Sequence, residues 1–292
     1  MEKVIRPVGQ PRVKKRQVIR SFEEAPLDGR TRLEKMFDEA RGQPALIGFA
    51  TAGSPDRETS LRVASALLEH CDALELGVPF SDPVLDGPVI QESSFRALQA
   101  GFRPRHIFGL VRELRKTSDK PLLIMTYYNP VHRMGHGPFC EAAAEAGADG
   151  LLIPDLPPEE MGDLRERAEE CGLAVVLFAS MTTPDDRLRM LGRLTQGFLY
   201  CFAVKGTTGM RESLSRELAP FLERARRFSH APIAAGLGIS NPEQCREVGR
   251  LADGVIVGSA LVKAALEALA AGEDPLHRVG ELAFLLKAAL LQ

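Results

Sequence analysis

Tryptophan is absent from this chain of 292 residues, and tyrosine occurs only three times. Aromatic residues make up 6% of the sequence, so an aromatic side chain at a strand end is a rare feature. No apolar run approaches the roughly 18 residues that suggest a membrane-spanning helix, and no N-terminal apolar segment resembles a signal peptide. These absences argue against secretion and membrane insertion, and they make the cytoplasm the expected location.

An excess of charge of one sign is also missing. The 37 basic and 39 acidic residues leave a formal net charge of −2, which does not favour nucleic-acid binding. Five cysteines are scattered without a CxxC spacing, so we expect free thiols in a reducing compartment. The histidines fall in predicted helices and polar segments, and no metal site is predicted.

Short apolar runs alternate with amphipathic segments over most of the chain. Residues 1–30 carry charge and proline with little apolar periodicity, which predicts a poorly ordered N-terminal extension. Residues 31–41 have the apolar spacing of a helix and open a catalytic domain predicted over residues 31–292. Eight apolar runs are typical of buried parallel strands: Ala45–Thr51, Ala73–Val78, Pro121–Tyr127, Gly150–Pro154, Ala174–Ala179, Phe198–Val204, Pro232–Gly236 and Gly254–Val257.

Proline and acidic residues mark the starts of several predicted helices, at residues 54–56, 158–160, 183–186 and 240–243. Eight strands that alternate with helices favour a single α/β domain of the (β/α)8 TIM-barrel class. A doubly wound open sheet is the alternative. Its dinucleotide-binding version is disfavoured because no GxGxxG motif follows the first strand.

The stretch from Leu74 to Pro88 places carboxylates in an unusual setting. Glu75 lies inside an apolar run, where burying a charge costs free energy unless the group is paired or used. The proline-stiffened loop that follows carries Asp82 and Asp86, and such loops build the active site of a barrel. Two carboxylates in unlike environments serve as acid and base. We predict that Glu75 and Asp86 form this pair. The structural alternatives are a buried ion pair for Glu75 and a turn position for Asp86. Asp82 is predicted to fix the loop or to lie at an interface.

Glycines and aromatic residues also gather at predicted strand ends. Glycine at a strand end that opens a helix lets backbone N–H groups approach an anion, and barrels commonly bind phosphate after strands seven and eight. The residues that predict such a site are Gly236, Gly238, Gly258 and Ser259. A third polar loop carries Gly206 and Thr208. Three interpretations of this loop stay open: it completes the phosphate site, it forms a mobile lid, or it is an ordinary surface loop. Phe49, Tyr127 and Tyr200 are candidates for the lining of the mouth, although each alone is more often a core residue.

The motifs that carry these residues resemble the tryptophan synthase α-subunit family. The stretch Leu74–Pro88 is the most specific part of the resemblance, which covers the chain from Thr31 to its C-terminus. The likeness continues in order through Met125–Pro130, Pro154–Pro157, Gly236–Ser240 and Gly258–Lys263.

The resemblance implies a retro-aldol cleavage of indole-3-glycerol phosphate to indole and glyceraldehyde 3-phosphate. In that family, the residue matching Glu75 moves the protons at indole C3 and at the side-chain hydroxyl. The residue matching Asp86 stabilises the positive charge on the indole nitrogen and takes its proton. By the same match, Phe49 and Tyr200 line the indole pocket, and Thr208 closes the lid by contacting Asp86. The four glycine and serine positions after strands seven and eight would hold the phosphate.

The resemblance also implies a partner. The family's α subunit contains no cofactor and works in an α2β2 assembly with a pyridoxal-phosphate β subunit, which receives indole through a tunnel. Asp82, Asp155 and Pro157 match the parts of the family that touch this β subunit.

The sequence departs from the family at the expected lid, where Ala203-Val204-Lys205 replaces the usual Ser-Arg, and at Leu237, where phenylalanine is common. A bidentate arginine is not replaced conservatively by valine. This departure motivates one alternative to the lyase, a subunit that mainly activates its β partner. Another phosphate-binding barrel lyase or isomerase is a separate alternative. A Schiff-base aldolase would need a lysine inside a strand, and the predicted strands contain none.

Overall fold

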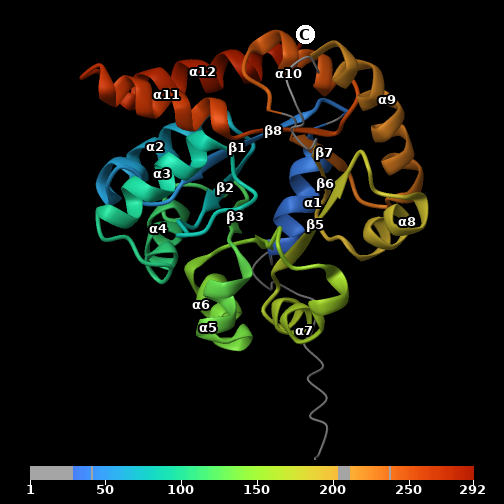
Figure 1. The fold of residues 1–292 in the computed structure, drawn as a ribbon, viewed down its shortest axis with the longest axis horizontal. Coiled ribbons are helices and arrows are strands. Elements are labelled where there is room, and N and C mark those ends of the chain that lie inside the picture. The colour runs from blue at the N-terminus through green and yellow to red at the C-terminus, as the bar shows by residue number, and fades with distance from the viewer. Residues whose placement is uncertain (1–28, 41, 203–210, 237) are drawn as a thin grey trace, which may run out of the picture.

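Eight parallel strands close into a barrel in the order in which they occur in the chain (Figure 1). The computed structural model describes residues 29–40, 42–202, 211–236 and 238–292. The strands are β1 Ala45–Thr51, β2 Ala73–Gly77, β3 Leu122–Met125, β4 Gly150–Leu152, β5 Ala174–Ser180, β6 Leu199–Phe202, β7 Ile233–Gly236 and β8 Gly254–Val257. The predicted TIM barrel and its eight strands are confirmed.

Most helices surround the strands on the outside of the barrel, whereas α1 lies near its centre in this view (Figure 1). The helices of the described residues are α1 Gly29–Glu39, α2 Arg57–His70, α3 Pro88–Gln99, α4 His106–Arg115, α5 Tyr128–Met134, α6 His136–Ala146, α7 Gly162–Glu170, α8 Asp185–Leu194, α9 Arg211–Phe228, α10 Pro242–Gly249, α11 Ser259–Ala270 and α12 Pro275–Leu290. The predicted N-terminal helix is present as α1. The boundary between an extension and the barrel at residue 30 stays a prediction, because residues 1–28 lie outside the described residues.

Side-chain caps explain where two of the predicted helices begin. Asp56 accepts a hydrogen bond from the backbone N–H of Thr59 (2.9 Å) at the start of α2, and Asn241 does the same for Gln244 (2.9 Å) in α10. The helix predicted to open at Pro158 is different, because residues 158–160 form a separate 3₁₀ turn, η1, and α7 begins only at Gly162. The backbone N–H of Glu160 donates to the carbonyl of Pro157, three residues back, as such a turn requires.

Strands β3 and β4 each end two residues earlier than the sequence suggests. Strand β3 stops at Met125, because Tyr127 already occupies the N-cap position of α5. Strand β4 stops at Leu152, ahead of the loop that carries Pro154 and Asp155. Both shorter strands leave polar side chains on loops at the carboxyl end of the barrel, where active sites of this fold are built.

The hydrophobic core has two layers, one inside the barrel and one between the strands and the outer helices. Inward-facing residues such as Ile47, Leu123 and Phe198 fill the barrel, and Leu33 from α1 belongs to the same cluster. Helix α1 therefore packs on the interior layer of the barrel. At the amino end of β4, the buried Asp149 pairs with Arg32 of α1 and Arg115 of α4.

Candidate active site

Glu75 stands inside β2, facing into the barrel. Its register partners are Phe49 on β1 and Leu123 on β3, and only 1% of its surface is exposed. Neither carboxylate oxygen meets a hydrogen-bond partner, so the described residues contain no ion-pair partner for it. Burial raises the pKa of Glu75 to about 8, which keeps the side chain protonated at neutral pH. A buried carboxylic acid without a structural partner is a group available for proton transfer.

Asp86 is fixed by the hydroxyl of Tyr127, which follows the neighbouring strand β3. It lies half-buried in the loop between β2 and α3, and the Tyr127 hydroxyl donates a hydrogen bond to its Oδ2 (3.2 Å). The same hydroxyl accepts from the backbone N–H of Leu85 (3.0 Å), and the ring of Phe80 stacks on the Tyr127 ring at 5.1 Å. Burial raises the pKa of Asp86, and the Tyr127 hydrogen bond opposes that rise. The two predicted catalytic carboxylates therefore occupy different environments.

Tyr200 on β6 lies near both carboxylates. Burial raises the pKa of its phenol, and the negative charges of Glu75 and Asp86 raise it further. Its ring packs on Phe178 of β5 at 4.9 Å, and a side chain at Gly236 would collide with it. Tyr200 thus lies between the carboxylates and the end of β7.

A pocket of about 310 Å³, including its open side, lies at the barrel mouth. Phe49, Asp86 and Tyr127, three of the residues predicted from the sequence, line this pocket together. Glu75 lies on the same face of β2 as Gly77, which also lines it, and the ring of Phe49 occupies the space that a side chain at Gly77 would need. The aromatic wall and the carboxylate predicted for the mouth are therefore brought together.

The predicted phosphate residues lie at the ends of two neighbouring strands. Strands β7 and β8 pair, Gly236 ends β7, and Gly258 is the N-cap residue of α11, which begins at Ser259. No side chain caps α11 within the described residues, so the backbone N–H groups of its first turn are open to an anion. Gly238 has a positive φ of 68°. The expected lid residues, Gly206 and Thr208 with residues 203–205, lie outside the described residues, as does Leu237.

The residues predicted to meet a partner lie on loops at the same end of the barrel. Asp82 is exposed and accepts a hydrogen bond from the Ser81 hydroxyl (2.6 Å). Asp155 and Pro157 are exposed on the loop after β4. Beside Asp82, the apolar side chains of Val84 and Leu85 are 79% and 60% exposed. Two large apolar groups in water next to the mouth are typical of an interaction surface.

Sequence reasoning missed two further residues of the site. Phe178 lies in a continuous apolar run, where nothing distinguishes it from the core. Thr51 ends β1 and could have been found from the sequence, because it is the one residue with a hydroxyl group in that apolar strand. Thr51 is 5% exposed, and its Oγ1 has no hydrogen-bond partner among the described residues.

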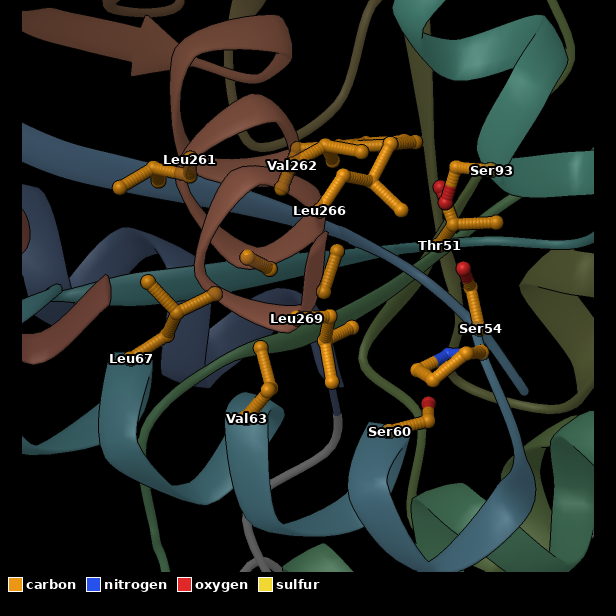
Figure 2. Close-up of a pocket in the computed structure, with 14 residues that line it drawn as sticks. Thr51, Ser54, Ser60, Val63, Leu67, Ser93, Leu261, Val262, Leu266 and Leu269 are labelled. Atoms are coloured by element: carbon orange, nitrogen blue, oxygen red, sulfur yellow. The ribbon is translucent and has the colours of Figure 1, made fainter. Parts of the chain in front are cut away.

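Thr51 also lines a second pocket, of about 410 Å³ including its open side, between β1, α2, α3 and α11. Figure 2 shows the hydroxyl side chains of Thr51, Ser54, Ser60 and Ser93 on one side of this pocket and the leucines of α2 and α11 on the other. Phe49 and Thr51 form the wall shared with the mouth pocket.

The described residues hold no group of three or more His, Cys, Asp and Glu side chains placed to bind a metal ion. Among these residues we find no helix with both the length and the apolarity needed to cross a bilayer.

The family model for the tryptophan synthase alpha chain matches residues 36–290. The chain belongs to the tryptophan synthase alpha chain family. It is 44% identical to the alpha chain of Methanoregula boonei over 235 residues, which cover 79% of this chain and 88% of that protein. It is 43% identical to the alpha chain of Pyrococcus furiosus over 220 residues, covering 75% and 89%. The resemblance found in the sequence is thereby confirmed.

Solved structures of this family share the fold. The alpha subunit from Legionella pneumophila superposes with a TM-score of 0.82 at 34% identity, over 89% of this chain and 98% of that one. A chain of Mycobacterium tuberculosis tryptophan synthase gives 0.81 at 35% identity, with the same coverage.

Proposed function

We propose that this chain is a tryptophan synthase α subunit that cleaves indole-3-glycerol phosphate to indole and glyceraldehyde 3-phosphate. Family membership supports the reaction. The observation that carries the assignment of residues is the buried, unpartnered carboxyl of Glu75 beside a mouth lined by Asp86. Burying such a carboxyl without a partner costs free energy in the folded protein. Its use in the proton transfers of this cleavage explains why the chain carries it there.

Glu75 acts as both acid and base. Its pKa of about 8 means that it holds a proton at neutral pH and can deliver that proton to indole C3. The resulting carboxylate then takes the proton of the hydroxyl on the carbon attached to C3. The electron pair of the O–H bond forms the C=O bond of glyceraldehyde 3-phosphate as the carbon–carbon bond breaks. The electron pair of the broken carbon–carbon bond returns to the ring, giving indole and a reprotonated Glu75.

Asp86 stabilises the intermediate state between these two transfers. Protonation at C3 places a positive charge on the ring nitrogen, and a carboxylate beside that nitrogen lowers the energy of the cation. Asp86 accepts the N–H proton and returns it to the nitrogen as the carbon–carbon bond breaks and indole forms. The hydrogen bond from Tyr127 holds the Asp86 carboxylate at the mouth and favours its charged form. Phe49 and Tyr200 supply aromatic walls for the indole ring.

The phosphate is bound after β7 and β8, and only β1 separates β8 from β2, whose following loop carries Asp86. Gly236 and Gly238 follow β7, and Gly258 and Ser259 open α11, so backbone N–H groups and one hydroxyl converge on a single anion. By the family resemblance we assign Gly206 and Thr208, which lie outside the described residues, to the same substrate site.

The partner is a β subunit that holds pyridoxal phosphate, in an α2β2 assembly, and this chain carries no cofactor of its own. Asp82 and the exposed Val84 and Leu85 form one part of the docking surface, and Pro157 on the loop after β4 forms another. All five cysteines are free thiols, which supports a reducing cytoplasmic compartment.

A steady-state assay of indole release from indole-3-glycerol phosphate, with the β subunit titrated in, tests this function. Asp86→Asn should lower turnover about 10²-fold, because the amide can accept a hydrogen bond but neither neutralises the ring cation nor takes its proton. The unfolding transition should be unchanged. Stimulation of the β subunit without turnover that requires Asp86 would replace the lyase by a purely activating subunit.

The pH dependence follows from Glu75. Because its pKa is about 8, the proton needed at C3 is lost as the pH rises through this value, and kcat/KM should fall about tenfold for each further pH unit.

The free energy of unfolding should also fall as the pH rises. The pKa of Glu75 in the folded protein, about 8, exceeds its ordinary value of 4.5. The contribution of Glu75 to the free energy of unfolding is therefore fully present below pH 4.5 and is lost as the pH rises through about 8. Urea unfolding across this range should show the loss, and Glu75→Gln should remove it.

A further inference from the structure

Helix α5 begins without a cap of its own. Tyr127 occupies the N-cap position in an extended conformation and makes no side-chain capping bond. Asp155, from the loop after the neighbouring strand β4, accepts the hydrogen bond of the Tyr128 backbone N–H instead, at 2.8 Å. A carboxylate at this place satisfies one open N–H group and lies at the positive end of the helix dipole. Asp155 is therefore a cap supplied from another loop.

The residue at this helix start is the one that holds Asp86. Tyr127 precedes Tyr128 directly, and its hydroxyl bonds Asp86 Oδ2 (3.2 Å) and the backbone N–H of Leu85 (3.0 Å). Burial raises the pKa of the Tyr127 phenol, and the charge of Asp155 adds to that rise, so Asp155 lies within electrostatic reach of it. The loops after β2, β3 and β4 are thus joined through two consecutive tyrosines.

Tyr128 has a second attachment on its outer side. Its hydroxyl lies 3.0 Å from Nε2 of His136, whose Nδ1 lies 2.7 Å from Oδ2 of Asp163 on α7. This outer attachment uses the Tyr128 side chain, whereas the bond to Asp155 uses its backbone. The two attachments can therefore be removed separately.

We propose that Asp155 is a positioning residue for the cleavage reaction: by capping α5 it holds the Tyr127 hydroxyl where it binds the loop that carries Asp86. The inference rests on the proposed function. It gives Asp155 a role within this chain, in contrast to the partner contact implied by the sequence resemblance.

Turnover of matched variants tests the inference. Asp155→Ala should lower kcat at least about tenfold with little change in KM, because a small displacement of a catalytic group is costly. Asp155→Asn should keep a rate near that of the wild type, since the amide oxygen is a good helix cap. Tyr128→Phe is the control, because it removes only the outer attachment and should leave the rate unchanged.

A double variant shows whether Asp155 acts through Tyr127. Tyr127→Phe removes the hydroxyl, so adding Asp155→Ala to it should cause no further loss of kcat, because the two changes break one chain of contacts. Multiplicative losses would overturn the proposal. It would also be overturned if Asp155→Asn and Asp155→Ala both lost stimulation by the β subunit while keeping the intrinsic rate, since that pattern defines a docking charge.

Amide hydrogen exchange gives a readout that does not need turnover. Asp155→Ala should speed exchange at both Tyr128 and Leu85 about fivefold, the factor that a typical helix cap is worth. Tyr127→Phe should speed exchange at Leu85 alone, and Asp155→Asn should change neither. Unchanged protection of Leu85 in Asp155→Ala would refute the inference. A wild-type chain that releases no indole would refute the proposed function instead, and the exchange result would still decide the role of Asp155.

Discussion

Replacement of Glu75 by glutamine should abolish measurable indole formation, with a loss of about 10²–10⁴-fold in kcat. The amide has nearly the volume of the carboxylic acid, but it neither donates a proton to indole C3 nor accepts one from the substrate hydroxyl. Because Glu75 is neutral at pH 7 in the folded protein, glutamine also preserves the charge of the buried site. Substrate binding should therefore change little. Steady-state indole release at saturating substrate measures the effect.

Asp82→Asn provides the matched control for this experiment. Asp82 belongs to the same stretch of sequence, but its side chain is exposed and bonds only its neighbour Ser81 among the described residues. The variant should keep the intrinsic rate of indole release. If Glu75→Gln retained most of the wild-type rate while folding normally, Glu75 would have no part in the proton transfers, and the buried carboxyl would need another explanation.

The barrel was predictable because its signals are local. Each strand is a short apolar run bounded by turn residues, and several helix starts are marked by a capping side chain such as Asp56 or Asn241. Glu75 was predictable for a different reason, since a charge within a buried strand is rare enough to stand out. The sequence therefore predicts both the architecture and the buried carboxyl of the candidate site.

The contacts that arrange the mouth could not be predicted in this way. The Tyr127 hydroxyl reaches Asp86 across 41 positions of sequence, and Asp155 reaches the backbone of Tyr128 across 27. These contacts depend on the register of neighbouring strands and on where each strand stops, neither of which local periodicity specifies. The ends of β3 and β4 were predicted two residues too late, and those ends decide which side chains lie on the loops.

At the other end of the barrel strands, Asp149 forms a buried charge network that has no part in the proposed chemistry. The carboxylate has no exposed surface, and it accepts hydrogen bonds from Arg32 (2.6 Å), from Arg115 and from the backbone N–H of Leu122 (2.6 Å). It therefore joins α1 and α4 to the start of β3. Burial raises the pKa of Asp149, and the charge of Arg115 opposes that rise.

Asp149→Ala should lower the free energy of unfolding by about 3–5 kcal/mol, because it leaves two partly buried guanidinium groups without their common partner. Urea unfolding followed by far-UV circular dichroism measures this loss. Glu113→Ala, which breaks an exposed ion pair with Lys116 on the neighbouring turn, should cost no more than about 1 kcal/mol. A loss as small as that control in Asp149→Ala would contradict a structural role for the network. The remaining folded protein should cleave substrate at the wild-type rate, because barrels of this kind separate a stabilising amino end from a catalytic carboxyl end.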